Sequence, residues 1–161
     1  MATVQRREVK KKIKPTGPRV DEKLMGPGDY EITEKHTFDV DVYLAKKGNR
    51  WIVVEKGLKT NIKQTVVFRI WTYDEMIELR KQSTSFDAIQ RMHMVDTDNL
   101  DRMKVQKLMQ SWTFGENNPR LKIHRVQGVL TDESWISFKK LQANIIRFIL
   151  EKMNEVLEYN G

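Results

Sequence analysis

The chain of 161 residues contains no cysteine, which excludes a disulfide scaffold and a cysteine-ligated zinc site and fits a reducing cytosol. No apolar run approaches the ~18 residues that a membrane-spanning helix needs, so no membrane association is expected. The charged start of the chain is not followed by an apolar segment, so no secretory signal is expected. This length predicts one domain, or one domain with an extension.

The formal net charge of +7 is concentrated at the start of the chain. Residues 1–20 hold one acidic residue and seven basic residues, which are Arg6, Arg7, Lys10, Lys11, Lys12, Lys14 and Arg19. This segment carries +6, whereas the remaining 22 basic and 21 acidic residues nearly cancel. The excess positive charge therefore belongs to one segment.

Residues 1–29 are predicted to form an extended arm, the basic arm, and residues 30–161 a single domain. Three of the four prolines lie in the arm, where Pro-Thr-Gly-Pro and Gly-Pro-Gly interrupt any regular element. Four of its apolar residues are isolated: Val4, Val9, Ile13 and Val20. Such a segment buries too little surface to offset its ordering entropy, so we expect it to become ordered on a partner.

Alternation of apolar and polar residues predicts a small sheet. Phe38, Val40, Val42 and Leu44 recur at every second position, as in a strand with one buried face. The turn residues 47–49 and a second strand over residues 51–55 complete a hairpin. Val66, Phe68 and Ile70 indicate a third strand, and three strands need helices on one face.

Helical spacing predicts the rest of the chain. Thr72 and Glu75 form a capping box that opens a helix to about residue 82. Further helices are predicted over residues 86–94 and 97–112. Residues 131–161 predict one long helix or, as the favoured alternative, two, with Thr131 as the first N-cap, a joint at 141–144 and Asn144 as the second cap. The fold class is therefore α+β, with an antiparallel sheet of about three strands packed by four or five helices.

An acidic cluster at residues 96–101 resembles a calcium-binding loop. That loop needs glycine at its sixth position and glutamate at its twelfth, where this chain has Asp101 and Lys107. We interpret the acids instead as the start of a helix, where the helix dipole favours them.

No catalytic constellation is present. Asp39 and Asp41 share one strand face, about 7 Å apart, and a solvated face is the simpler interpretation. His36, His93 and His124 have no ligand spacing, and no phosphate-binding loop or nucleophile motif occurs. We therefore predict no enzyme, no cofactor and no metal site.

The basic arm allows three interpretations. It could dock on an acidic protein surface, it could bind the phosphates of a nucleic acid with a strong dependence on salt, or it could be a solvated tail. The arm has no aromatic residue before Tyr30, so it offers no stacking platform for bases. Docking on protein is the leading prediction, with the seven basic residues as its contacts.

Methionine and tryptophan provide a second set of candidates. Six methionines fall in predicted helices, where they fill the core or line an adaptable groove: Met76, Met92, Met94, Met103, Met109 and Met153. Trp112 and Trp135 are candidate interface anchors, because tryptophan is enriched at binding hot spots.

The segments of residues 68–161 resemble a bacteriophage tail-assembly protein of the tail-assembly-chaperone or baseplate-assembly kind. The resemblance rests on four pieces: an aromatic-Thr-Tyr-Asp-Glu-Met helix start (71–76), Leu-x-x-Met-Lys-Val-Gln-Lys-Leu-Met-x-Ser-Trp (100–112), Gly-Val-Leu-Thr-Asp-Glu-Ser-Trp (128–135) and Met-Asn-Glu-Val-Leu-Glu (153–158). The basic arm lies outside it, and arms of this kind are typical of proteins that stay in a virion.

The resemblance implies work through protein–protein contacts. The expected function is that of a phage morphogenesis or virion structural protein, a part of the tail or baseplate or an assembly factor for it. Its expected partners are other tail or baseplate proteins in a hetero-assembly. Its expected location is the bacterial host cytoplasm during assembly, with the virion as a possible final place. The alternative is a nucleic-acid-binding accessory protein that uses the arm.

Overall fold

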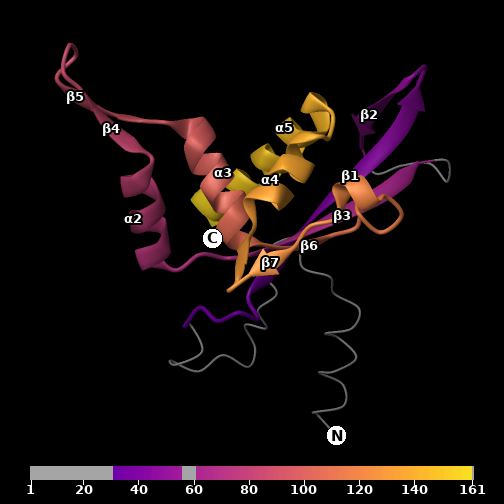
Figure 1. Cartoon of the computed structure of the whole chain (residues 1–161), viewed down its shortest axis with the longest axis horizontal. Coiled ribbons are helices and arrows are strands. Elements are labelled where there is room, and N and C mark those ends of the chain that lie inside the picture. Colours follow the sequence, from indigo (N-terminus) through magenta and orange to yellow (C-terminus); the bar gives the residue numbers. More distant parts are fainter. Residues whose placement is uncertain (1–30, 56–60, 161) are drawn as a thin grey trace, which may run out of the picture.

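A computed structural model describes residues 31–55 and 61–160, so the predicted basic arm lies outside the described residues. The fold is α+β, around an antiparallel sheet of four strands in the order β2-β1-β3-β6 (Figure 1). These strands are β1 (Thr37–Lys47), β2 (Arg50–Val54), β3 (Ile62–Arg69) and β6 (Met109–Trp112). The predicted hairpin β1–β2 and the third strand are confirmed.

One face of the sheet packs against the helices and forms one side of the hydrophobic core. The alternating residues of β1 that were predicted to point inward are all buried, because a strand presents successive side chains to opposite faces. Phe38 and Phe68 face each other across β1 and β3, with ring centroids 5.6 Å apart. This pair joins the two central strands under the helices.

Helices cover that face of the sheet (Figure 1). The α-helices in the described part are α2 (Tyr73–Gln82), α3 (Thr97–Leu108), α4 (Asp132–Lys139) and α5 (Ala143–Asn154). Two shorter helical segments are the 3-10 turn η3 (Pro119–Leu121) and the π-helix η4 (Glu155–Asn160). Two small hairpins pair β4 (Thr84–Asp87) with β5 (Met92–Val95) and β7 (Arg125–Val126) with β8 (Val129–Leu130).

Side-chain caps set the helix starts. The predicted capping box is present: Thr72 accepts from the Glu75 amide, and the Glu75 carboxylate accepts from the Thr72 amide. Thr131 caps α4 as predicted, by accepting from the Ser134 amide. Asp96 caps α3 by accepting from the Asn99 amide, in agreement with a helix start.

The predicted helix over residues 86–94 is wrong. The chain forms the β4–β5 hairpin there, with a turn at residues 88–91. The Asp87 carboxylate accepts from the amides of Ile89 and Gln90, and Arg91 adopts a positive φ of 53°. Because an aspartate that binds nearby amides favours a turn over a helix, the helical spacing of the apolar residues did not decide the structure.

The predicted helix over residues 97–112 is too long, and the prediction of about three strands is one strand short. Helix α3 ends at Leu108, and Met109 turns into an extended backbone with ψ of 126°. The next residues pair with β3 and bury Met109 and Trp112 against the core. Pairing with β3 provides the residues of β6 with backbone hydrogen bonds, and the spacing of apolar residues along the sequence does not predict such a long-range pairing.

The break in the C-terminal stretch falls at the predicted joint, between α4 and α5. The predicted cap is wrong, because Gln142 occupies the N-cap position and makes no capping bond. Gln142 and Asn144 instead bind the edge strand β2: the Trp51 amide donates to Gln142 Oε1 at 3.0 Å, and Asn144 Nδ2 donates to the Trp51 carbonyl at 3.1 Å. These bonds occupy backbone groups that an edge strand would otherwise expose.

Candidate interaction surface

The β4–β5 hairpin projects from the body beyond the ends of α2 and α3, which it connects (Figure 1). At its base, the Asp96 amide donates to the Ser83 carbonyl at 2.7 Å. Ser83 is buried, and its hydroxyl lies 3.4 Å from the Met103 sulfur. Thr84 adds a hydrogen bond from its hydroxyl to the Arg80 carbonyl. The base is therefore fixed to both helices, although the strands beyond it extend away from them.

The hairpin exposes an unusual share of apolar surface. Five of the ten exposed large hydrophobic side chains in the described residues lie on it: Phe86, Ile89, Met92, Met94 and Val95. Ile89, in the turn, is 94% exposed. Exposed apolar side chains gathered on one element of a soluble protein make that element a candidate interaction site or an aggregation hazard.

Both faces of the hairpin contribute to this surface. Phe86 pairs with His93 across the strands, with ring centroids 5.4 Å apart in an edge-on arrangement. Met92 and Met94 lie on the opposite face, because adjacent residues of a strand alternate. A two-stranded hairpin is only marginally stable by itself in water. Docking on a partner would bury this apolar surface and supply the missing support.

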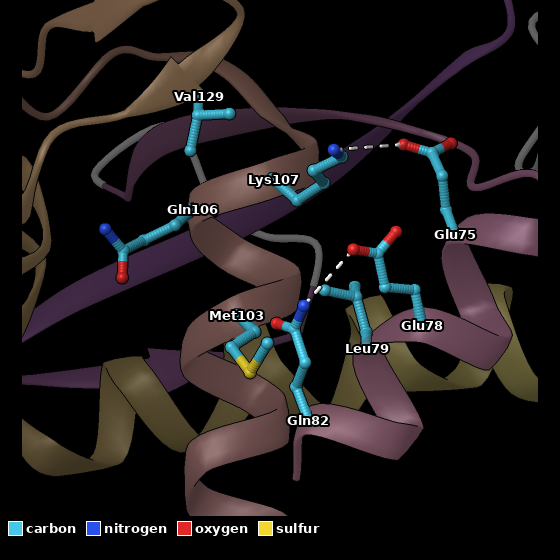
Figure 2. Close-up of a pocket in the computed structure, with 8 residues that line it drawn as sticks. All are labelled: Glu75, Glu78, Leu79, Gln82, Met103, Gln106, Lys107 and Val129. Carbon is cyan, nitrogen blue, oxygen red and sulfur yellow. Dashed lines mark hydrogen bonds and ion pairs between the residues drawn. The ribbon is translucent and has the colours of Figure 1, made fainter.

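A small groove between α2 and α3 adjoins the hairpin base (Figure 2). It has a volume of about 220 Å³. Leu79 and Met103 form its apolar part, and the polar groups of Glu75, Glu78 and Lys107 line it. The remaining lining residues are Gln82, Gln106 and Val129. The groove is large enough for a side chain of a partner, not for a large cofactor.

The groove contains one strongly fixed carboxylate. The Arg69 guanidinium donates two hydrogen bonds to Glu75, at 2.8 and 2.7 Å, and lowers the pKa of this carboxyl to about 2 against an opposing effect of burial. Lys107 lies 3.9 Å away and adds to the effect. Glu75 is therefore ionised at neutral pH and is held in place by its cationic neighbours.

The surroundings of the hairpin are acidic. Residues 72–101, which comprise α2, the hairpin and the first turn of α3, are called the hairpin surface below. They contain seven acidic and three basic residues, a formal charge of −4. Asp74, Glu78, Asp96 and Asp98 are exposed. The hairpin surface thus combines exposed apolar side chains with negative charge.

The predicted site residues lie elsewhere. The seven basic residues of the arm fall outside the described residues. Trp112 is only 7% exposed, and its indole donates to the Leu121 carbonyl at 2.8 Å. Trp135 is half-buried and stacks on Phe138, with centroids 5.2 Å apart. Both tryptophans thus have contacts within the chain, and their predicted role as anchors stays a prediction.

The six methionines divide between the core and the hairpin surface. Met109 and Met153 are fully buried, and Met76 and Met103 are half-buried. Met92 and Met94 are exposed on the hairpin rather than on the helix that was predicted there. Only Met103 lines the groove between α2 and α3, so the methionines do not form a continuous groove in the described part of the chain.

Other titratable residues show ordinary structural contacts. Asp41 accepts from the Thr65 hydroxyl and lies 3.8 Å from Lys63. His36 binds Thr33 in the turn before β1. In residues 31–55 and 61–160, no three His, Asp or Glu side chains lie close enough together to hold a metal ion. No helix in these ranges has both the length and the apolar character for crossing a membrane.

No protein-family model matches the chain, and neither does any curated protein or solved structure.

Proposed function

We propose that this chain is a non-enzymatic assembly protein that acts through protein–protein contacts, with the hairpin surface as a principal contact. The observation that carries the proposal is the set of five large apolar side chains exposed on a projecting two-stranded hairpin. Met92 and Met94 suit this role, because the thioether side chain adapts to different partner shapes. The exposed acids around them would form a polar rim.

The class of assembly that we propose is bacteriophage morphogenesis, as a tail or baseplate component or as an assembly factor. The resemblance of residues 68–161 to tail-assembly proteins supports this class. The expected partners are other tail or baseplate proteins, and the expected place is the host cytoplasm during assembly and then the virion. The basic arm would dock on neighbouring subunits of the same assembly.

A second candidate function is binding of nucleic acid through the basic arm. The charge of +6 over residues 1–20 favours it, because each lysine or arginine that neutralises a phosphate releases a counterion. Such binding would weaken steeply with salt. It would not involve the acidic hairpin surface, so substitutions on the hairpin separate the two candidates.

The test is capture of partners by the full chain from a lysate of its native source, with and without nuclease. The hairpin variant carries Phe86→Ser and Ile89→Ser. The control variant carries Val126→Ser and Ile136→Ser, which remove two exposed apolar side chains from β7 and α4.

We expect a tail or baseplate protein, identified by mass spectrometry, to be retained after nuclease treatment by the wild type and the control. The hairpin variant should retain at least tenfold less. Equal retention by the hairpin variant would contradict the proposed contact. Loss of every captured protein with nuclease would favour the nucleic-acid function instead.

A further inference from the structure

We propose that the basic arm of one copy of this chain docks on the hairpin surface of a second copy, in a head-to-tail arrangement. The inference rests on the proposed function and names one partner of the same surface. The arm would provide lysines and arginines for the exposed acids and isolated aliphatic side chains for the apolar hairpin.

Charge selects this surface for the arm. Residues 1–20 carry +6, and the whole arm, residues 1–29, carries +4. The hairpin surface carries a formal −4, although Glu75 within it is already paired with Arg69 and Lys107. Residues 30–71 and 102–161 contain 18 basic and 11 acidic residues, so the rest of the domain carries +7. The balance of formal charge therefore favours the hairpin surface over the rest of the domain as the contact of a cationic arm. Exposed charges interact over about one Debye length, ~8–10 Å at physiological salt, so the attraction depends on salt.

The hairpin offers an edge on each strand for an added segment. Among residues 31–55 and 61–160, the β4–β5 sheet contains two strands, so each strand has a strand neighbour on one side only in this part of the chain. An extended peptide can add to such an edge through its backbone, with alternate side chains providing specificity. Three strands are also markedly more stable than two. The exposed apolar residues of the hairpin would gain cover at the same time.

The sequence of the arm suits strand addition. Its first proline is Pro15, so residues 2–14 retain every backbone donor. In an extended segment, Val9, Lys11 and Ile13 fall on one face and Lys10, Lys12 and Lys14 on the other. The first face can place Val9 and Ile13 against apolar hairpin side chains, while the second presents three ammonium groups to the acids around them.

The place where the arm joins the domain and the place of the hairpin also allow contact between copies. Near the start of the described chain, the His36 carbonyl accepts from the Ile70 amide at 2.9 Å, just before α2 begins. The hairpin follows the other end of α2, and Figure 1 shows it projecting away from this start. Helix α2 is about 15 Å long and the hairpin adds about 13 Å. Each copy can therefore provide an arm at one end and receive one at the other.

Such a contact is heterologous, because it joins two different surfaces of the same chain. Heterologous contacts produce a ring when the rotation between copies closes and an open filament when it does not. The thirty residues before Glu31 can span at most ~100 Å, which is ample for reaching a neighbouring copy. Self-association of the full chain is thus the direct consequence.

The test is sedimentation velocity of the nuclease-treated full chain over a hundredfold range of concentration, in 50 mM and 500 mM NaCl. The arm variant carries Lys10→Glu, Lys11→Glu and Lys12→Glu. The surface variant carries Glu78→Lys and Asp98→Lys, two exposed acids. The matched controls are Lys139→Glu with Lys140→Glu, and Glu116→Lys with Glu133→Lys, all at exposed positions.

We expect the wild type and both controls to self-associate at low salt and to dissociate at least tenfold more readily at high salt. The arm variant alone and the surface variant alone should each associate at least tenfold more weakly. An equimolar mixture of the two should recover association, because the reversed arm of one matches the reversed surface of the other. Ile89→Asp, at a 94% exposed position, should weaken association without unfolding the chain.

A wild type that stays monomeric over the whole concentration range would overturn the inference. This outcome includes the case in which the arm docks on the hairpin of its own copy. Equal association of the charge-reversal variants, or a mixture without recovery, would also overturn it. None of these results bears on the proposed function. A monomeric chain that still captures a tail protein through the hairpin would leave the function standing, whereas a self-associating chain that captures nothing would contradict the function alone.

Discussion

Lys104 and Glu158 form an ion pair in the interior between α3 and the π-helix η4, with Nζ and Oε1 2.7 Å apart. Lys104 is only 2% exposed. Its ammonium also donates to Asn154 Oδ1 at 2.7 Å and lies 5.0 Å from the centre of the Trp71 ring. Arg80 of α2 binds the second oxygen of Glu158. This network fixes the C-terminal turn to two helices.

The first prediction concerns this buried ion pair. Glu158→Gln leaves the Lys104 ammonium buried without its counter-ion, so we expect the free energy of unfolding to fall by about 3 kcal/mol. Lys104→Met combined with Glu158→Gln removes the buried charge as well, so the double variant should be more stable than Glu158→Gln. Urea denaturation of the three proteins measures both differences. A double variant less stable than the single one would contradict this account.

The second prediction concerns pH. Because the Arg69 guanidinium lowers the pKa of Glu75 from 4.5 to about 2, folding favours the ionised carboxylate. This contribution is complete above about pH 4.5 and is lost as the pH falls toward 2, and its size is about 2–3 kcal/mol. Glu75→Gln should therefore destabilise the protein at pH 7 and have little effect near pH 2.

Denaturant unfolding at pH 7, 4 and 2.5 measures this pH dependence. The control is Glu78→Gln, in the same helix and exposed, where the carboxylate accepts a hydrogen bond from the Gln82 side chain. We expect the control to change stability by less than about 0.5 kcal/mol at every pH. A loss of the same size for Glu75→Gln at pH 7 and pH 2.5 would show that the carboxylate charge is not the cause.

The third prediction concerns Gly115, which is buried beside the η3 turn. A Cβ atom at this position would lie 2.6 Å from the Leu121 carbonyl oxygen, which accepts the Trp112 indole hydrogen bond. Gly115→Ala must therefore displace backbone, and we expect a loss of about 1–3 kcal/mol. Tryptophan fluorescence should report the disturbed indole. Unchanged stability and an unchanged spectrum would contradict the close approach.

The fourth prediction compares how much a hairpin side chain and a core side chain contribute to stability. Ile89→Ser removes a side chain that is 94% exposed, so the free energy of unfolding should change by less than about 0.5 kcal/mol. Met109→Ala empties a fully buried position and should cost about 2–5 kcal/mol. Thermal and urea unfolding of both variants check the contrast. A large loss for Ile89→Ser would show that the hairpin packs within the chain.

Local patterns predicted the parts of the fold that local chemistry determines. The alternation in β1 requires one buried face, and the capping box at Thr72 and the cap at Thr131 satisfy the first amides of their helices. The strand β6 was not predictable in this way. Met109 and Trp112 fit a helical stripe that continues from Leu108, and only pairing with β3, some forty residues earlier, makes the backbone extended after Leu108.

The hairpin surface was missed for a related reason. Phe86, Ile89 and Met92 have helical spacing, yet no second element within the described part of the chain buries them, so the amphipathic pattern did not correspond to a packed helix face. The signal that could have indicated the turn is Asp87, whose side chain caps the amides that follow it. The basic arm could therefore be identified from the charges in the sequence, whereas the hairpin surface became visible only in the three-dimensional structure.

The hydrogen bond between the Asp96 amide and the Ser83 carbonyl brings the two ends of the hairpin together. The residues between them can be shortened, lengthened or replaced without moving α2 or α3, because the closed base already satisfies the helix ends. The hairpin is in this sense a module that the body carries without depending on it for its own fold.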